Sequence, residues 1–220
     1  MTYDVISTGS TGNAVVIDGQ ILIDCGVPYK KLGVYVKNLL LVLLTHRHSD
    51  HFRPATISAL HKTRPALRFG CCPWMVDPLL EAGVHPRSID LFYPGREYRY
   101  PRFSVRPEPL RHNVPNCGYH ITNAAGERLF YATDTGTLEG IQAKNYDLYL
   151  VEANHTKEEL QARLAAKQAA GEFSYEWDVA ENHLSREQAE DWIYQNIGPK
   201  GRYAFLHQHI EKRGTNHAET

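Results

Sequence analysis

The stretch Leu39-Leu-Leu-Val-Leu-Leu-Thr-His-Arg-His-Ser-Asp-His51 decides the fold of this 220-residue chain. Its first six residues, Leu39–Leu44, are an unbroken apolar run, which is typical of a strand that is buried on both faces of a sheet. Three histidines and an aspartate follow almost at once: His46, His48, Asp50 and His51. The cluster could be a polar loop that is rich in histidine by chance. Imidazole nitrogens and carboxylate oxygens at this spacing instead favour a site for two divalent metal ions, which suit ester hydrolysis.

The composition is typical of a globular cytosolic enzyme. With 42% hydrophobic residues the chain can bury one sizeable core, so we expect a single domain over 1–210 and a polar tail over 211–220. No apolar stretch approaches the roughly 20 residues of a membrane span, and the N-terminus has no signal-peptide pattern. These features predict a cytoplasmic protein without membrane contact.

The cysteines bear on the redox state of the protein, and the net charge bears on its substrate. The four cysteines (Cys25, Cys71, Cys72 and Cys117) show no CxxC spacing and are expected to be reduced. Twenty-four basic and 25 acidic residues give a net charge of −1, whereas proteins that track long nucleic acids are usually basic. The balance favours a small substrate or a short nucleic-acid end.

Predicted strands and helices alternate along the chain, which indicates a layered α/β arrangement. The predicted strands are Tyr3–Ser7, Ala14–Asp18, Gln20–Asp24, Leu39–Thr45, Leu67–Cys71, Glu97–Tyr100, Phe103–Leu110, Gly118–Thr122, Arg128–Ala132, Leu148–Val151 and Tyr203–Leu206. The predicted helices are Tyr29–Asn38, Pro54–Thr63, Trp74–Glu81, Thr156–Ala170 and Ser185–Asn196, the last opening on a Ser185/Gln188 capping box.

The motif His46-x-His48-x-Asp50-His51 after an apolar strand resembles the signature of the metallo-β-lactamase superfamily. Ser7–Asn13 and Ile21–Gly26 look like that fold's opening turn and second strand pair. Val151–His155 and Asn182–Ser185 resemble the YycJ/WalJ type of short phosphodiesterase, a relative of ribonuclease Z that includes phage-encoded members. The resemblance implies a four-layer αββα sandwich, with two facing sheets and metals where the strands end.

The resemblance also implies a set of metal ligands. One ion would be bound by His46, His48 and His112, the other by Asp50, His51 and His207, with Asp134 bridging both beside a hydroxide. Zinc is the expected metal, with manganese and iron as alternatives. His209 competes with His207 for the last position and would otherwise lie outside the ligand set or in solvent. We call His46–His51 the ligand loop. Asp24 is expected to support this loop through hydrogen bonds without touching metal.

Glu152 and His183 bear on the type of reaction. In the ribonuclease Z-like branch a matching glutamate orients a histidine that protonates the leaving oxygen, so the catalytic residues would be His183, Glu152 and the ligand Asp50. Histidine suits this task because it titrates near neutral pH. Alternatively, Glu152 caps the helix Thr156–Ala170 and His183 is a solvated residue before the next helix.

Together these patterns predict a dinuclear metal-dependent phosphodiesterase that acts on nucleic-acid ends or nucleotides, with the bridging hydroxide as nucleophile. A cyclic-nucleotide phosphodiesterase like the phage anti-Pycsar enzymes, a glyoxalase II-like thioesterase and a non-catalytic sensor or scaffold are the alternatives. Phe173, Tyr175 and Trp177 alternate, so an extended segment would carry three rings on one face. These rings could stack a base, pack in the core, or contribute to a homodimer that completes the pocket.

Overall fold

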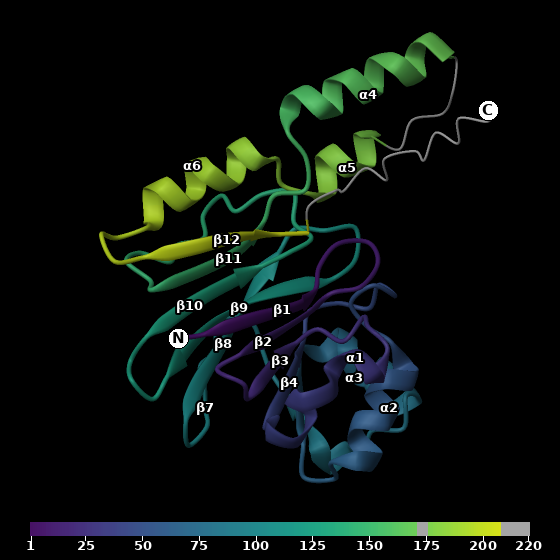
Figure 1. Cartoon of the computed structure of the whole chain (residues 1–220), viewed down its shortest axis with the longest axis vertical. Coiled ribbons are helices and arrows are strands. Elements are labelled where there is room, and N and C mark those ends of the chain that lie inside the picture. The colour runs from purple at the N-terminus through teal and green to yellow at the C-terminus, as the bar shows by residue number, and fades with distance from the viewer. Residues whose placement is uncertain (171–175, 208–220) are drawn as a thin grey trace, which may run out of the picture.

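The computed structural model describes residues 1–170 and 176–207, and two six-stranded sheets face each other in it (Figure 1). The first sheet runs in the order β1 (Tyr3–Ser7), β2 (Ala14–Ile17), β3 (Ile21–Ile23), β4 (Leu41–Leu44), β5 (Arg68–Cys71) and β6 (Ile89–Leu91). The second runs in the order β12 (Arg202–Leu206), β11 (Leu148–Glu152), β10 (Arg128–Ala132), β9 (Asn116–Asn123), β8 (Phe103–Leu110) and β7 (Tyr98–Arg99).

Strand β4 shows why its sequence is apolar without interruption. Leu41 and Leu43 pack in the core between the two sheets. Val42 and Leu44 point to the opposite face and pack in the core beneath the helices. Because successive side chains of a strand alternate between faces and both faces are covered, every position must be apolar.

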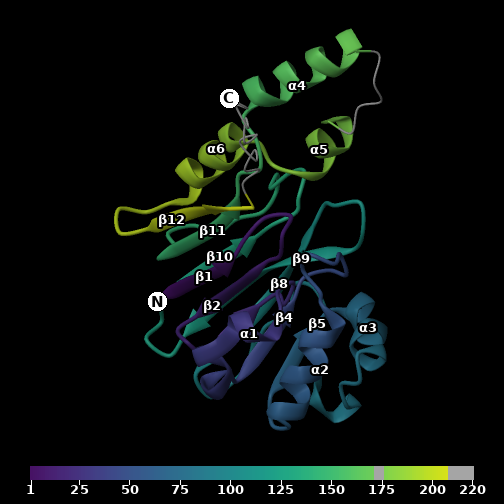
Figure 2. The same ribbon diagram turned by 45° about the vertical axis from the view of Figure 1, so that its right-hand side comes forward.

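Helices cover the outer face of each sheet (Figures 1 and 2). Over the first sheet lie α1 (Tyr29–Leu32), α2 (Pro54–Thr63) and α3 (Val76–Glu81), which share a core with β4 and β5. Over the second lies α6 (Arg186–Asn196), whose Trp192 and Ile193 pack with Phe130 and Tyr149. The four-layer αββα sandwich is therefore confirmed, as is the capping box at Ser185 and Gln188.

Several local predictions differ from the structure. The helix predicted over Tyr29–Asn38 ends as α1 at Leu32, because Gly33 adopts a φ of 38° and a 3₁₀ helix follows over Gly33–Asn38. Strand β6 and helix α5 (Glu176–Asn182) were not predicted.

The extended face of three rings is wrong at Trp177, which lies in helix α5 with 63% of its surface exposed. Phe173 and Tyr175 lie outside the described residues. All four cysteines are free and buried, as expected. Among the described residues, no helix is both long and apolar enough to cross a membrane.

Five strand ends meet at one edge of the sandwich. Strands β10, β11 and β12 are parallel, and β8 runs in the same direction because both β8 and β10 are antiparallel to β9. The predicted metal ligands lie in the loops after β4, β8, β10 and β12, Glu152 is the last residue of β11, and His183 follows helix α5. Loops at the carboxyl ends of parallel strands are a common place for a site in sheets of this kind.

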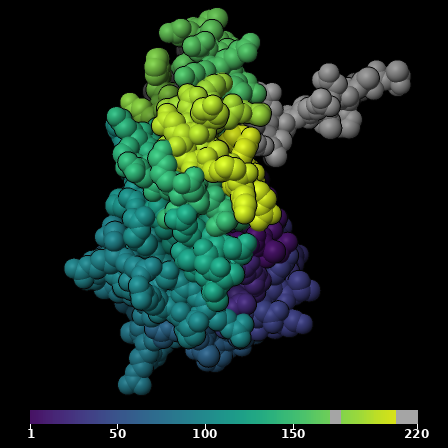
Figure 3. All heavy atoms as spheres, turned by 90° about the vertical axis from the view of Figure 1, so that its left-hand side faces the viewer, coloured from purple at the N-terminus to yellow at the C-terminus, as the bar shows by residue number. Residues whose placement is uncertain are grey.

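Strands β1 and β12 are edge strands of different sheets, and Figure 3 shows purple atoms from the start of the chain against yellow atoms from near residue 200. An Nη2–H of Arg202 donates to the carbonyl oxygen of Met1 at 2.9 Å, and the N–H of His207 donates to Oγ1 of Thr8 at 2.7 Å. The second bond fixes the backbone of a predicted ligand to the connection between β1 and β2.

Tyr149→Phe tests the hydrogen bonds that hold the end of α6 against the second sheet. The buried Tyr149 hydroxyl accepts from the N–H of Tyr146 at 2.8 Å and lies 2.7 Å and 2.9 Å from the carbonyl oxygens of Ala143 and Asn196. Its loss leaves buried groups unpaired, so we expect the free energy of unfolding to fall by about 1–3 kcal/mol. Urea denaturation measures this, and Tyr203→Phe on the neighbouring strand, which is half exposed, should change it little.

Candidate metal centre

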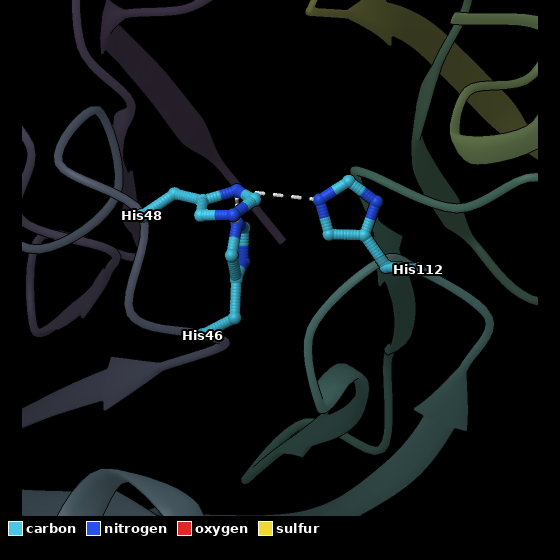
Figure 4. A group of neighbouring side chains, drawn as sticks. All are labelled: His46, His48 and His112. Atoms are coloured by element: carbon cyan, nitrogen blue, oxygen red, sulfur yellow. Dashed lines mark hydrogen bonds between the residues drawn. The ribbon is translucent and has the colours of Figure 1, made fainter. Parts of the chain in front are cut away.

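Three histidines from two loops converge at the strand ends (Figure 4). Nδ1 of His48 lies 3.1 Å from Nε2 of His46 and 3.3 Å from Nε2 of His112. His46 and His48 come from the loop after β4, and His112 follows β8 on the facing sheet. The three nitrogens lie within 4.8 Å of one another, a spacing that a single ion can bridge.

The electrostatic setting keeps these three rings neutral. Burial and the other imidazoles hold the pKa of His46 far below its usual range, and burial lowers the pKa of His112 to about 4. Burial also lowers the pKa of His48. A neutral imidazole is the form that binds a metal ion, so this trio is ready to do so.

A second group lies beside the first and is rich in carboxylates. Oδ2 of Asp50 lies 3.7 Å from Nε2 of His51 and 3.6 Å from Nε2 of His207. Asp134 lies between the groups, with Oδ2 2.7 Å from Nε2 of His51 and Oδ1 3.5 Å from Nε2 of His207. One ligand atom each of Asp134, His46 and His51 lie within 4.8 Å of one another. His46 belongs to the first group and His51 to the second, so Asp134 lies where a carboxylate could bridge two ions.

Unpaired atoms in this second group indicate that it fits a cation. Nε2 of His207 and Oδ2 of Asp134 are buried without a hydrogen-bond partner among the described residues, although His51 lies close to the latter oxygen. Burial lowers the pKa of His207, but Asp134, Asp50 and Glu152 outweigh it and raise the value to about 10. Burial likewise opposes a charge on His51, yet Asp134 and Asp24 raise its pKa well above the usual range. The carboxylates therefore attract positive charge to this point.

Partners behind the rings orient three of the histidines. Nδ1 of His51 donates to Oδ2 of Asp24 at 2.7 Å, Nδ1 of His46 lies 2.9 Å from Oγ1 of Thr45, and Nδ1 of His112 lies 3.2 Å from the carbonyl oxygen of Asn182. In each ring this leaves Nε2 facing the centre, as in histidine ligands whose outer nitrogen is held by a carboxylate or carbonyl. Asp24 also accepts from the N–H and Oγ1 of Thr45, so its predicted supporting role is confirmed.

Asn13 is a residue of the site that sequence reasoning did not single out. It is buried in the connection between β1 and β2, and its Nδ2 lies 2.8 Å from Nε2 of His51 and 3.2 Å from the carbonyl oxygen of Asp50. Its Oδ1 accepts from the N–H of Gly9 at 2.9 Å. The Gly12-Asn13 pair in the opening turn was the available signal, but only the fold reveals that the turn reaches the ligand loop.

The backbone adopts an uncommon conformation at three positions of the site. Asp24, Asp134 and His207 have φ values of 60°, 57° and 52°, in the left-handed region that residues other than glycine seldom occupy. At Asp134 an Nδ2–H of Asn116 holds the turn through the carbonyl oxygens of Thr133 and Asp134. Such conformations concentrate at functional sites because the surroundings must enforce them.

Glu152 and His183 are in contact at the rim of the centre. Nδ1 of His183 lies 3.0 Å from Oε2 of the fully buried Glu152, whose Oε1 accepts from the N–H groups of Thr135 and Leu184. Glu152 therefore does not cap the helix α4 (Lys157–Ala170), as the alternative interpretation required. Burial opposes its ionisation, but hydrogen bonds with His183 and His207 lower the pKa of Glu152.

The His183 ring stacks on the ring of His207 with centroids 5.2 Å apart. The side chain of His183 is 17% exposed. The structure thus brings together every predicted site residue except His209, which lies outside the described residues.

A four-layer sandwich with histidine and aspartate side chains that could hold metal at the strand ends defines the class as a metallo-β-lactamase-fold protein. Residues 20–207 match the beta-lactamase superfamily domain, and the chain belongs to this family. Exodeoxyribonuclease WalJ of Streptococcus pneumoniae (strain D39) is 23% identical, with 96% of this chain and 81% of WalJ covered.

Solved structures agree with the fold. Human tRNase Z, short form, has a TM-score of 0.72 at 15% identity over 94% of this chain and 92% of the other. The metallo-beta-lactamase fold protein YhfI from Bacillus subtilis has a TM-score of 0.68 at 18% identity over 94% and 86%. The chain is a hydrolase of this fold.

Asp24→Asn tests the support of the ligand loop. One carboxylate oxygen becomes an amide nitrogen, so either His51 or Thr45 loses its acceptor. We expect metal affinity to fall by about 10–100-fold, the usual effect of changing a partner behind a ligand. Competition with a chromophoric chelator measures the affinity. Asp90→Asn, which changes a carboxylate paired with Arg68 elsewhere, should leave it unchanged; equal losses in both variants would contradict the role of Asp24.

Proposed function

We propose that this protein is a dinuclear metal-dependent phosphodiesterase that acts on nucleic-acid ends or nucleotides. The observation that carries the proposal is the contact of His183 with the buried Glu152 beside two groups of metal-binding side chains. The catalytic unit is the single domain over residues 1–210, with 211–220 as its tail. The names of the exodeoxyribonuclease and tRNase Z relatives support a nucleic-acid substrate.

Seven residues would hold the two ions. His46, His48 and His112 fit the first, Asp50, His51 and His207 fit the second, and Asp134 fits both. Zinc suits this set of nitrogen and oxygen donors, and manganese or iron are the alternatives. When bound, two such ions would neutralise phosphate charge and supply an activated water for attack on phosphorus.

His183 would donate the proton that the leaving oxygen needs. Its Nδ1 faces Glu152, which leaves Nε2 as the nitrogen available to a substrate. Glu152 is fixed by two backbone N–H groups, so it positions the ring without moving itself. An alkoxide is a poor leaving group and benefits from a general acid, whereas a thiolate leaves without one. The arrangement therefore favours a phosphodiester over a thioester.

Product analysis tests the proposed activity. Zinc-loaded and manganese-loaded protein would be incubated separately with linear DNA, RNA, cyclic mononucleotides and a thioester. Cleavage of a linear strand supports the proposal, and cleavage of cyclic mononucleotides alone would instead identify a cyclic-nucleotide phosphodiesterase. Hydrolysis of a thioester with no diester cleaved would contradict it.

We also propose that the protein forms a homodimer through the α4–α5 segment. Leu160 is the one buried residue of α4, and Trp177 of α5 is largely exposed close to His183 in sequence. Light scattering should give twice the chain mass of 25.0 kDa, and Trp177→Glu should lower it to that of one chain. A wild-type monomer at micromolar concentration would contradict the prediction.

Asp134→Ala tests the number of ions. Elemental analysis of wild-type protein prepared without chelator should find two transition-metal ions per chain. The variant should lose both or retain one, because no other described carboxylate lies within ligand distance of both His46 and His51. The exposed Asp191→Ala serves as the control and should keep both ions. A wild-type protein without stoichiometric metal would contradict the assignment.

His183→Ala tests the general acid. The variant should keep both ions and lose about 10²–10⁴ in turnover of a natural diester, the usual range for this type of catalysis. The loss should shrink with bis(p-nitrophenyl) phosphate, because p-nitrophenolate departs without a proton. His85→Ala, an exposed histidine near the far end of β6, is the matched control. Equal losses on both substrates would rule out proton donation, and loss of metal would show that His183 is a ligand.

A further inference from the structure

Three arginines lie next to the metal centre without a charged partner among the described residues. Arg47 lies between His46 and His48, Arg111 directly precedes His112, and Arg53 follows His51 by two residues. All three are exposed. Consecutive Cα atoms are 3.8 Å apart, so each arginine lies within about 8 Å of a proposed ligand at the backbone. We name Arg47, Arg53 and Arg111 the arginine rim.

The rim differs from four other arginines of the protein. Arg68, Arg99, Arg106 and Arg186 each pair with a carboxylate. Within residues 1–170 and 176–207, no ion pair or hydrogen bond involves the guanidinium group of a rim arginine. Positive charges that stay unpaired beside a hydrolytic centre are available to an anionic ligand.

Backbone hydrogen bonds hold two of the three rim residues in place. The N–H of Arg111 donates to Oγ1 of Thr135 at 3.2 Å, and its carbonyl oxygen accepts from the N–H of Gly136. The N–H of Arg53 donates to the carbonyl oxygen of Cys25 at 2.9 Å. Both segments are thereby tied to the loops that carry Asp134 and Asp24.

Helix α5, which lies beside the centre, has the other sign of charge. Helix α5 contains acidic residues, among them the exposed Asp178 and Glu181, and no lysine or arginine. Its end packs closely on the turn after Asp134, where a Cβ added to Gly136 would meet the carbonyl oxygen of Glu181 at 1.9 Å. A chain of phosphates would be repelled from α5 and attracted to the rim.

We infer that the arginine rim binds the phosphates of a single strand of nucleic acid and leads it into the metal centre. The inference rests on the proposed phosphodiesterase function and names its substrate class. A single strand suits the site because His46 and His51 are fully buried, and a flexible end reaches a recessed centre more easily than a duplex does. The net charge of −1 does not oppose this, since at physiological salt charges more than about 8 Å away are largely screened.

Salt dependence of binding tests the rim. The probe is a fluorescein-labelled phosphorothioate oligodeoxythymidylate of about twelve nucleotides, which keeps its charges, resists hydrolysis and spans a usual single-strand site. For single strands the slope of log K against log salt changes by about 0.7 for each phosphate that the protein ceases to neutralise. We expect Arg47→Gln, Arg53→Gln and Arg111→Gln each to reduce the slope by about this amount in fluorescence anisotropy titrations.

Arg102→Gln is the matched control. Arg102 is exposed and has no described ion pair, but it lies before β8 whereas His112 follows that strand, so eight strand residues, about 26 Å, separate them. The slope of log K against log salt for the Arg102→Gln variant should equal that of the wild type. Unchanged slopes in all three rim variants, or an equal fall in the control, would overturn the inference, with metal content and melting temperature showing that the variants are folded.

Hydrolysis of bis(p-nitrophenyl) phosphate by the wild type separates this inference from the proposed function. If the wild type cleaves that diester but binds the strand without salt dependence, the rim inference is wrong and the phosphodiesterase stands. If the slopes fall as expected while no diester is cleaved, the rim stands as a binding surface and the proposed activity fails.

Discussion

The rest of the site depends on the contacts that the buried carboxylate of Asp134 makes with histidines. This carboxylate lies against His51 and His207 and within ligand distance of His46, and these residues come from loops of both sheets. Burial opposes its charge, but His51 and His207 outweigh that cost, so the pKa of Asp134 lies well below its usual range. A buried anion must be paired, and three loops are therefore drawn to one point. The left-handed turn at Asp134 and the bonds from Asn116 are the backbone conditions for this convergence.

The two halves of the centre differ in their electrostatics. The trio of His46, His48 and His112 is kept neutral by burial and mutual repulsion, and it offers nitrogen donors without charge. The half that contains Asp50, His51 and His207 carries carboxylates, and these keep protons on the imidazoles. A cation that enters the second half must displace those protons, whereas the first half already presents free nitrogens.

Much of the fold and the site could be predicted because their signals are local. The apolar run of β4 needs both faces covered, and the spacing from His46 to His51 lies within one loop. The contact between Asn13 and the loop after β4 could not be predicted. It depends on how the β1–β2 connection folds onto Asp50. Helix α5 was missed because Trp177 continues an alternation of aromatics that begins before the helix, and so short a pattern does not distinguish a strand from a helix. Where Gly33 ended α1 early, a single left-handed residue outweighed the helical pattern around it.

Helix α5 connects the proposed general acid with the first metal group. The carbonyl oxygen of Asn182, at its end, lies 3.2 Å from Nδ1 of His112, and the next residue is His183. The N–H of His183 donates to the carbonyl oxygen of Val179, so the helical turn fixes the ring's starting point. Glu152 then fixes its direction from a rigid strand end. The proposed acid His183 and the proposed ligand His112 therefore share one support, the end of helix α5.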